Sequence, residues 1–142
     1  MAMIKVTGAV GTRAGKRLLM PGFFFESRAK TPFVNQEKRL EPVDMHYPER
    51  IVDDVIYHLP EGVTVEGAPQ DSQESWAGHA LFITKSKATP GKLEIAFVVV
   101  RAFSTVKPEE YQDLRGFYQK VAATAQEQLV LSSSPAAKGN DE

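Results

Sequence analysis

Apolar and polar residues alternate along much of this chain, and proline or glycine interrupts the alternation at intervals of about ten residues. Alternation with a period of two is typical of a β-strand that buries one face. We therefore predict a mainly β fold, an antiparallel β-sandwich of about seven or eight strands. The strands are expected within residues 3–10, 16–20, 23–25, 43–47, 55–59, 63–65, 76–86, 93–103 and 129–131.

Two of these segments show the alternation most clearly. In residues 43–47 and 55–59 the odd positions are apolar, whereas most even positions are polar. Pro48 follows the first segment and indicates a turn. The pattern predicts a half-buried antiparallel hairpin, with the odd residues inside and the even residues in solvent. Residues 67–75 are polar and are expected to be a connection.

The segment from Leu93 to Phe103 differs, because both its odd and its even positions are largely apolar. The turn sequence Thr89-Pro90-Gly91-Lys92 precedes it. A strand that is apolar on both sides is typical of the centre of a sheet with both faces covered. We therefore expect this strand to lie in the middle of a sheet and to be covered from both sides.

A single segment has helical periodicity, and it lies near the C-terminus. Pro108 and two glutamates suit a first helical turn. The helix is predicted over about residues 108–127, with its apolar face formed by Tyr111, Leu114, Tyr118, Val121, Ala122 and Ala125. Residues 1–131 are expected to form one domain and residues 132–142 a flexible tail. Residues 27–41 are expected to be a surface loop anchored at Phe33 and Val34.

Composition excludes several classes of function. The 142 residues are 42% hydrophobic and 25% charged, with a formal net charge of −1 and no cysteine. The charge balance argues against nucleic acid as a partner, and the absence of thiols excludes a cysteine nucleophile or thiolate metal site. No apolar run approaches the length of about 20 residues needed to span a bilayer, and the sequence carries no signal-peptide pattern.

The histidines are the candidates for metal or acid–base chemistry. In the predicted hairpin, Asp44, His46, Asp54 and His58 share one face and could in principle bind a divalent ion. The same four positions are also what a solvated strand face looks like, and this is the interpretation we favour. We therefore expect no metal site, no cofactor and no catalytic residue. The glycines near the N-terminus have hairpin spacing and match no phosphate-binding loop.

Aromatic residues offer the candidate contacts with a partner. On a strand over 23–25, Phe23 and Phe25 share one face and Phe24 faces the other way. If the outer two rings enter the core, Phe24 needs a cover, which can be the helix, the 27–41 loop or another domain. Trp76 and other aromatics could instead form a platform for sugar stacking, although core positions are the commoner role for such residues.

Four short motifs, in their order along the chain, carry a resemblance to a known family. They are Gly15–Phe25 (GKRLLMPGFFF), Pro42–Pro48 (PVDMHYP), Tyr57–Gly62 (YHLPEG) and Pro108–Tyr111 (PEEY). Together they resemble the C-terminal β domain of unknown function of bacterial exported transglutaminase-like proteins. In such proteins this domain follows an N-terminal β domain and a transglutaminase/protease-like core.

The resemblance implies that this chain is a non-catalytic accessory domain. The family's Cys-His-Asp triad belongs to the core, so no catalytic residue carries over to a chain without cysteine. The implied partner is the upstream transglutaminase-like domain of the same polypeptide, and the implied location is outside the cytoplasm, as part of a larger exported protein. The alternative is a module that binds carbohydrate or cell-wall peptide through exposed aromatics.

Overall fold

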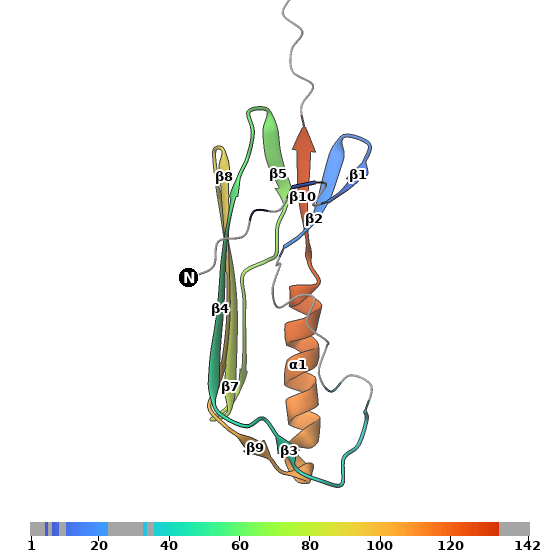
Figure 1. Ribbon diagram of the computed structural model, residues 1–142, viewed down its shortest axis with the longest axis vertical. Helices are drawn as coiled ribbons and strands as arrows, with labels where there is room; N and C mark the ends of the chain where they lie inside the picture. The colour runs from blue at the N-terminus through green and yellow to red at the C-terminus, as the bar shows by residue number, and fades with distance from the viewer. Residues whose placement is uncertain (1–4, 6, 9–10, 23–32, 34–35, 134–142) are drawn as a thin grey trace, which may run out of the picture.

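The computed structural model describes residues 5, 7–8, 11–22, 33 and 36–133 of the chain. Within these residues, ten strands and one helical segment are present, and the helix lies beside the strands rather than among them (Figure 1). That segment begins as the 3-10 helix η1 (Pro108–Glu110) and continues as α1 (Tyr111–Ala125). The strands are β1 (Thr12–Ala14), β2 (Arg17–Pro21), β3 (Val43–Asp44), β4 (Glu49–His58), β5 (Val63–Gly67), β6 (Ser72–Trp76), β7 (Ala80–Thr89), β8 (Lys92–Arg101), β9 (Thr105–Val106) and β10 (Gln128–Ser133).

The largest layer is an antiparallel sheet with the strand order β4-β8-β7-β6, here called the long sheet. Its strands β4, β7 and β8 have ten residues each and pair over their full length without a register shift. Pro90 and Gly91 form the turn between β7 and β8, as the sequence predicts. Gly91 has a φ of 74°, which glycine adopts without the steric penalty of a side chain.

The second layer combines a smaller sheet with the helix. The smaller sheet has the order β1-β2-β10-β5, and β10 begins shortly after α1 ends. Figure 1 shows α1 and β10 end to end on the same side of the long sheet, so that the helix lies over one half of the sheet and the smaller sheet over the other. A two-stranded sheet of β3 and β9 lies near the start of the helix.

The helix forms where its periodicity predicts it. Pro108 occupies the first helical turn, and the Glu110 carboxylate accepts a hydrogen bond from the Lys107 N–H at 3.2 Å. The buried face consists of Tyr111, Leu114, Phe117, Val121 and Ala125. Phe117 is absent from the predicted face, whereas the predicted Tyr118 is only half-buried.

The main core lies between the long sheet and the second layer. The odd residues of β8 enter it from the sheet, and Phe117, Val121 and Leu129 enter it from the other layer. Phe82 and Phe97 meet edge to face, with 5.0 Å between ring centroids. A second cluster joins the β3–β9 sheet to the start of the helix through Val43, Val106, Tyr111 and Leu114.

The predicted fold class is confirmed: the protein is mainly β, its sheets are antiparallel, and its helix lies near the C-terminus. The predicted hairpin of residues 43–47 with 55–59 is wrong. Val43 and Asp44 pair with β9, and β4 pairs with β8. The chain leaves strand conformation after Asp44, whose carboxylate accepts the His46 N–H at 2.8 Å, and His46 itself has a φ of 66°. This local turn ends β3 after Asp44.

Further boundaries differ from the expectation. Residues 72–75 were expected to belong to a connection, but together with Trp76 they form β6. The single strand expected over 76–86 is divided, because β6 ends at Trp76 and β7 begins at Ala80. Strand β4 begins at Glu49, six residues before the expected start at Val55. At the C-terminus, β10 extends to Ser133, because Ser132 and Ser133 still pair with β5. No helix in the described part of the chain has the length and apolarity required to cross a membrane.

Candidate functional site

The face of the long sheet that points away from α1 is here called the outer face. It carries the even residues of β4 and β8 and the odd residues of β7, because the register places Val52 opposite Val98, and Val98 opposite Ile83. Figure 1 shows the long sheet with α1 on one side of it. In the described part of the chain no sheet or helix packs on the outer face.

Aliphatic side chains gather at one end of this outer face. Two adjacent rows contain them: Val52, Val98 and Ile83 in one row, and Val100 and Leu81 in the next. Val52 is 44% exposed, and the other four are half-buried. We call these five residues the outer patch. They form an aliphatic surface across three strands.

Charged residues dominate the other end of the outer face. Lys85 and Lys87 are exposed on β7, and Asp54 is exposed on β4. Lys92 and Glu94 form an ion pair on β8 at 2.5 Å. The hydrogen bond from Lys92, together with its positive charge, lowers the pKa of Glu94. The outer face therefore changes from aliphatic to charged along the strands.

A buried polar cluster supports the aliphatic end of the long sheet from the inside. Arg101, the last residue of β8, is only 8% exposed. Its guanidinium donates to the Glu49 carboxylate and to the Tyr47 carbonyl, both at 3.1 Å, and to the Tyr118 hydroxyl at 3.2 Å. Arg101 thus ties β4, the chain before β4 and the helix together at one point.

His79 likewise has a structural role. His79 stacks on Trp76, with 4.2 Å between ring centroids and 8° between the ring planes. Its Nε2 lies 3.4 Å from the Glu110 carboxylate. None of the three histidines, all of which lie in the described part of the chain, forms a hydrogen bond with a hydroxyl group.

The four residues that the sequence placed on one face are separated by the topology. Asp44 and His46 lie at β3, where the His46 ring is 3.5 Å from the Asp44 carboxylate. Asp54 and His58 lie on β4, in another sheet, and all four are exposed. Among the described residues no group of three or more potential ligands is close enough to hold a metal ion. The face they were expected to share does not exist, because the hairpin does not form.

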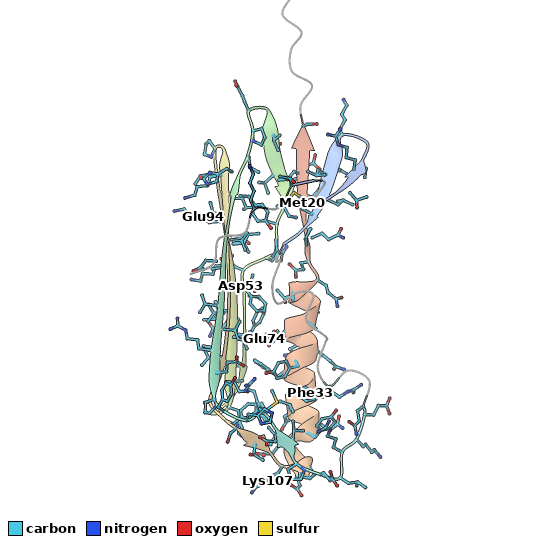
Figure 2. The ribbon with its side chains drawn as sticks, viewed as in Figure 1. Met20, Phe33, Asp53, Glu74, Glu94 and Lys107 are labelled. Atoms are coloured by element: carbon cyan, nitrogen blue, oxygen red, sulfur yellow. The ribbon has the colours of Figure 1, made fainter. Side chains whose placement is uncertain are left out.

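The remaining predicted contact, Phe24, lies outside the described residues, as do Phe23 and Phe25. Of the two residues predicted to anchor the 27–41 loop, Val34 lies outside the described residues, whereas Phe33 is described and packs on the helix. Its ring packs edge to face on Tyr118 at 5.4 Å, and the Arg115 side chain donates to its carbonyl at 3.2 Å. Figure 2 shows Phe33 beside the helix.

Sequence reasoning missed the outer patch as a site, although a signal for it was present. The apolar even residues of β8, among them Val98 and Val100, led to the expectation that both faces of this strand are covered. The structure confirms that β8 is central, and its odd residues are buried. Its even residues remain half-buried, with no element of the described chain above them. The signal for the outer patch was the apolar character of these even residues of β8, combined with the aliphatic Val52 on the solvent-facing side of β4.

Comparisons with known proteins give one family and one similar structure. The family model of the Domain of Unknown Function with solved-structure structure (DUF3858) matches residues 16–131. A similar solved structure is that of "a putative protease" from Parabacteroides distasonis, with a TM-score of 0.57 and 16% sequence identity. The match covers 67% of this chain and 19% of the Parabacteroides chain. No curated protein matches the chain.

The family match and the fold agree. The matched residues run from β2 to β10 and so include every strand of the long sheet together with the helix. The structural likeness is to a small part of a much longer protein. Because the family model covers most of its length, this chain belongs to the DUF3858 family of domains of unknown function.

Proposed function

We propose that this protein is a non-catalytic accessory domain that packs, through the outer patch, against a transglutaminase- or protease-like core. The observation that carries the proposal is the aliphatic surface of Val52, Leu81, Ile83, Val98 and Val100. As implied by the resemblance, the longer protein of which the domain is a part is exported.

The chemistry of the outer patch supports docking. A partly exposed aliphatic side chain gains free energy when a partner removes its remaining surface from water, at about 25 cal/mol per Å². The five aliphatic side chains lie on three hydrogen-bonded strands of the long sheet, so little backbone entropy is lost when they are covered. The neighbouring charges of Lys85, Lys87 and Asp54 would lie at the rim, where charged groups contribute mainly to orientation.

The comparison supports a role within a larger protein. The region similar to this chain makes up 19% of the Parabacteroides protein, which is named as a protease candidate. In the Parabacteroides protein most of the polypeptide lies outside the similar region and is available as a surface on which a small domain can dock. A domain without cysteine and without a hydroxyl–histidine pair among its described residues would shape or stabilise such a core, while the chemistry takes place elsewhere.

The test uses a separately produced transglutaminase-like core from the same organism. Calorimetric titration of this chain into the core should give saturable binding. The double variant Ile83→Thr/Val100→Thr keeps β-branched side chains and so keeps the strand geometry. We expect it to weaken binding by at least about tenfold, since two polar groups would be buried without partners. Gln119→Ala, on the exposed face of the helix, is the matched control.

Three results would contradict the proposal. The first is the absence of binding, and the second is binding that the outer-patch variant leaves unchanged. The third is peptide hydrolysis or transamidation by the purified chain that a single substitution within it abolishes. A thermal melt of each variant ensures that weakened binding is not the result of unfolding.

The alternative of sugar binding finds no platform among the described residues. The stacking candidates Trp76 and Tyr57 face inward: Trp76 contacts His79 and Phe103, and Tyr57 is 9% exposed. In this part of the chain Tyr47 is the exposed aromatic residue. Tyr47 alone does not form the contiguous aromatic surface that sugar stacking requires. The other stacking candidates, Phe23, Phe24 and Phe25, lie outside the described residues.

A further inference from the structure

Strand β4 is an edge strand of the long sheet. It pairs with β8 on one side, and no strand of the described chain pairs with its other side. The pairing with β8 extends over ten consecutive residues, with no bulge. Its sequence, from Glu49 to His58, contains neither proline nor lysine. Two of its exposed residues, Val52 and Ile56, are aliphatic.

Long regular edge strands attract other strands, and proteins usually block them. The common blocks are a proline, a bulge, a very short strand or charged side chains, lysine above all. Of these, β4 has charged side chains other than lysine, namely Glu49, Arg50, Asp53 and Asp54. Such charges admit a partner strand where the register sets opposite charges against each other. The opposite edge strand β6, in contrast, is short and polar. The inward-facing Asp53 of β4 takes part in interactions within the chain. The structure of β4 is therefore that of a strand able to accept a partner strand.

We propose that β4 pairs antiparallel with β4 of a second copy of this chain, with the two-fold axis at Val52. Val52 then lies opposite Val52 of the second copy. Arg50 lies opposite Asp54 of the second copy, and by symmetry Asp54 lies opposite Arg50. The pairing runs from Glu49 to Val55 and contains two complementary charge pairs on the outer face.

The three neighbouring registers lack this complementarity. A two-fold axis at Asp53 or Asp54 places identical carboxylates opposite each other, and an axis at Ile51 places Glu49 opposite Asp53 of the second copy, twice. Like charges in directly opposed positions destabilise a strand pair, whereas opposite charges stabilise it. An axis at Ile56 opposes no like charges, but it leaves Arg50 outside the pairing and joins fewer residues of the strand. Charge complementarity and the length of the pairing together favour the register centred on Val52, with a second copy of this strand as the occupant.

The pairing also continues the surface described above. In the Val52 register, one aliphatic row crosses the junction: Ile83, Val98 and Val52 of one copy, then the same three residues of the other. The dimer would therefore form a single sheet of eight strands with the outer patches of both copies joined. This inference concerns the edge of the sheet and does not depend on docking at its face.

The experiment measures the association of the full 142-residue chain by sedimentation equilibrium over a range of concentrations. The wild type should reach a monomer–dimer equilibrium. Arg50→Asp and Asp54→Arg should each weaken the dimer by at least about tenfold, because two attractive cross-strand pairs become repulsive. The double variant Arg50→Asp/Asp54→Arg exchanges the charges and should restore the dimer.

Controls separate this edge from other surfaces. Lys85→Glu reverses a charge on the same outer face but two strands away from the edge, and it should leave the dimer unchanged. A wild-type chain that stays monomeric at every concentration would overturn the proposal. So would a dimer that the single variants leave intact, or a charge exchange that fails to restore association. Circular dichroism of each variant verifies that the exposed substitutions preserve the fold.

Discussion

Arg101 and Glu49 face each other across β8 and β4, and their side chains form an ion pair at 3.1 Å. The arginine is 8% exposed, so its guanidinium depends on the few protein groups that touch it for hydrogen bonds. The pair lies at the aliphatic end of the long sheet, and it connects the first residue of β4 with the last residue of β8. It therefore fixes the register of the two strands that carry the centre of the outer patch.

Removing the carboxylate from this pair should destabilise the protein. Glu49→Ala leaves the buried guanidinium with the Tyr47 carbonyl and the Tyr118 hydroxyl as its remaining hydrogen-bond partners among the described residues. We expect the free energy of unfolding to fall by about 1–3 kcal/mol, as measured by urea denaturation. The matched control is Glu66→Ala, which removes the exposed ion pair with Arg17 and should change stability by less than about 1 kcal/mol. Equal effects of the two variants would contradict the structural role of Arg101.

The helix should depend on its buried leucine. Leu114 is fully buried between the helix and the β3–β9 sheet. Leu114→Ala should lower the free energy of unfolding by about 2–5 kcal/mol, because the substitution leaves a cavity. Gln119→Ala, on the exposed side of the same helix, should have little effect on the melting temperature. Similar midpoints for the two variants in thermal melts would show that the helix is not docked in this way.

Tyr57 should make stability depend on pH in the alkaline range. Burial raises its pKa to about 12, and its hydroxyl donates to the carbonyls of Pro21 and Gly22 at 2.9 and 3.0 Å. The stabilisation is complete below about pH 10, the pKa of an unfolded tyrosine, and is lost as the pH rises toward 12. The loss should reach about 2–3 kcal/mol, measured as the difference between wild type and Tyr57→Phe in denaturant titrations at pH 9 and pH 12. A parallel decline in both proteins would assign the effect to other groups.

Thr84 should tolerate the loss of its hydroxyl group. Thr84 is fully buried opposite Ser72, and neither hydroxyl has a hydrogen-bond partner among the described residues. Thr84→Val keeps the shape and removes the unsatisfied polar atom. We expect the free energy of unfolding to stay unchanged or to rise by up to about 1 kcal/mol. Thr84→Ser keeps the hydroxyl but removes a methyl group, and it should destabilise by about 1 kcal/mol. A destabilised Thr84→Val would show that the hydroxyl has a partner in solution.

Local features of the sequence predicted a large part of the fold correctly. The turn at Pro90 and Gly91 follows from proline and glycine chemistry, and the helix follows from Pro108 and an apolar repeat. The central position of β8 follows from its apolar composition. Each of these signals comes from neighbouring residues or from the periodicity of one segment. It can therefore be recognised without knowledge of the rest of the chain.

Strand partners and the exposure of strand faces were decided by the tertiary structure. Nothing near Val43 and Asp44 in the sequence indicates that they pair with β9, some sixty residues away, so the predicted hairpin and its candidate metal face were wrong. The apolar even residues of β8 indicated a cover but could not identify it. Whether another part of the chain covers the even residues of β8 depends on which face of the long sheet the helix and the smaller sheet pack against. In this protein both pack on one side of the long sheet, because β10 follows α1 after a short connection, and no element of the described chain covers Val52 and Val98.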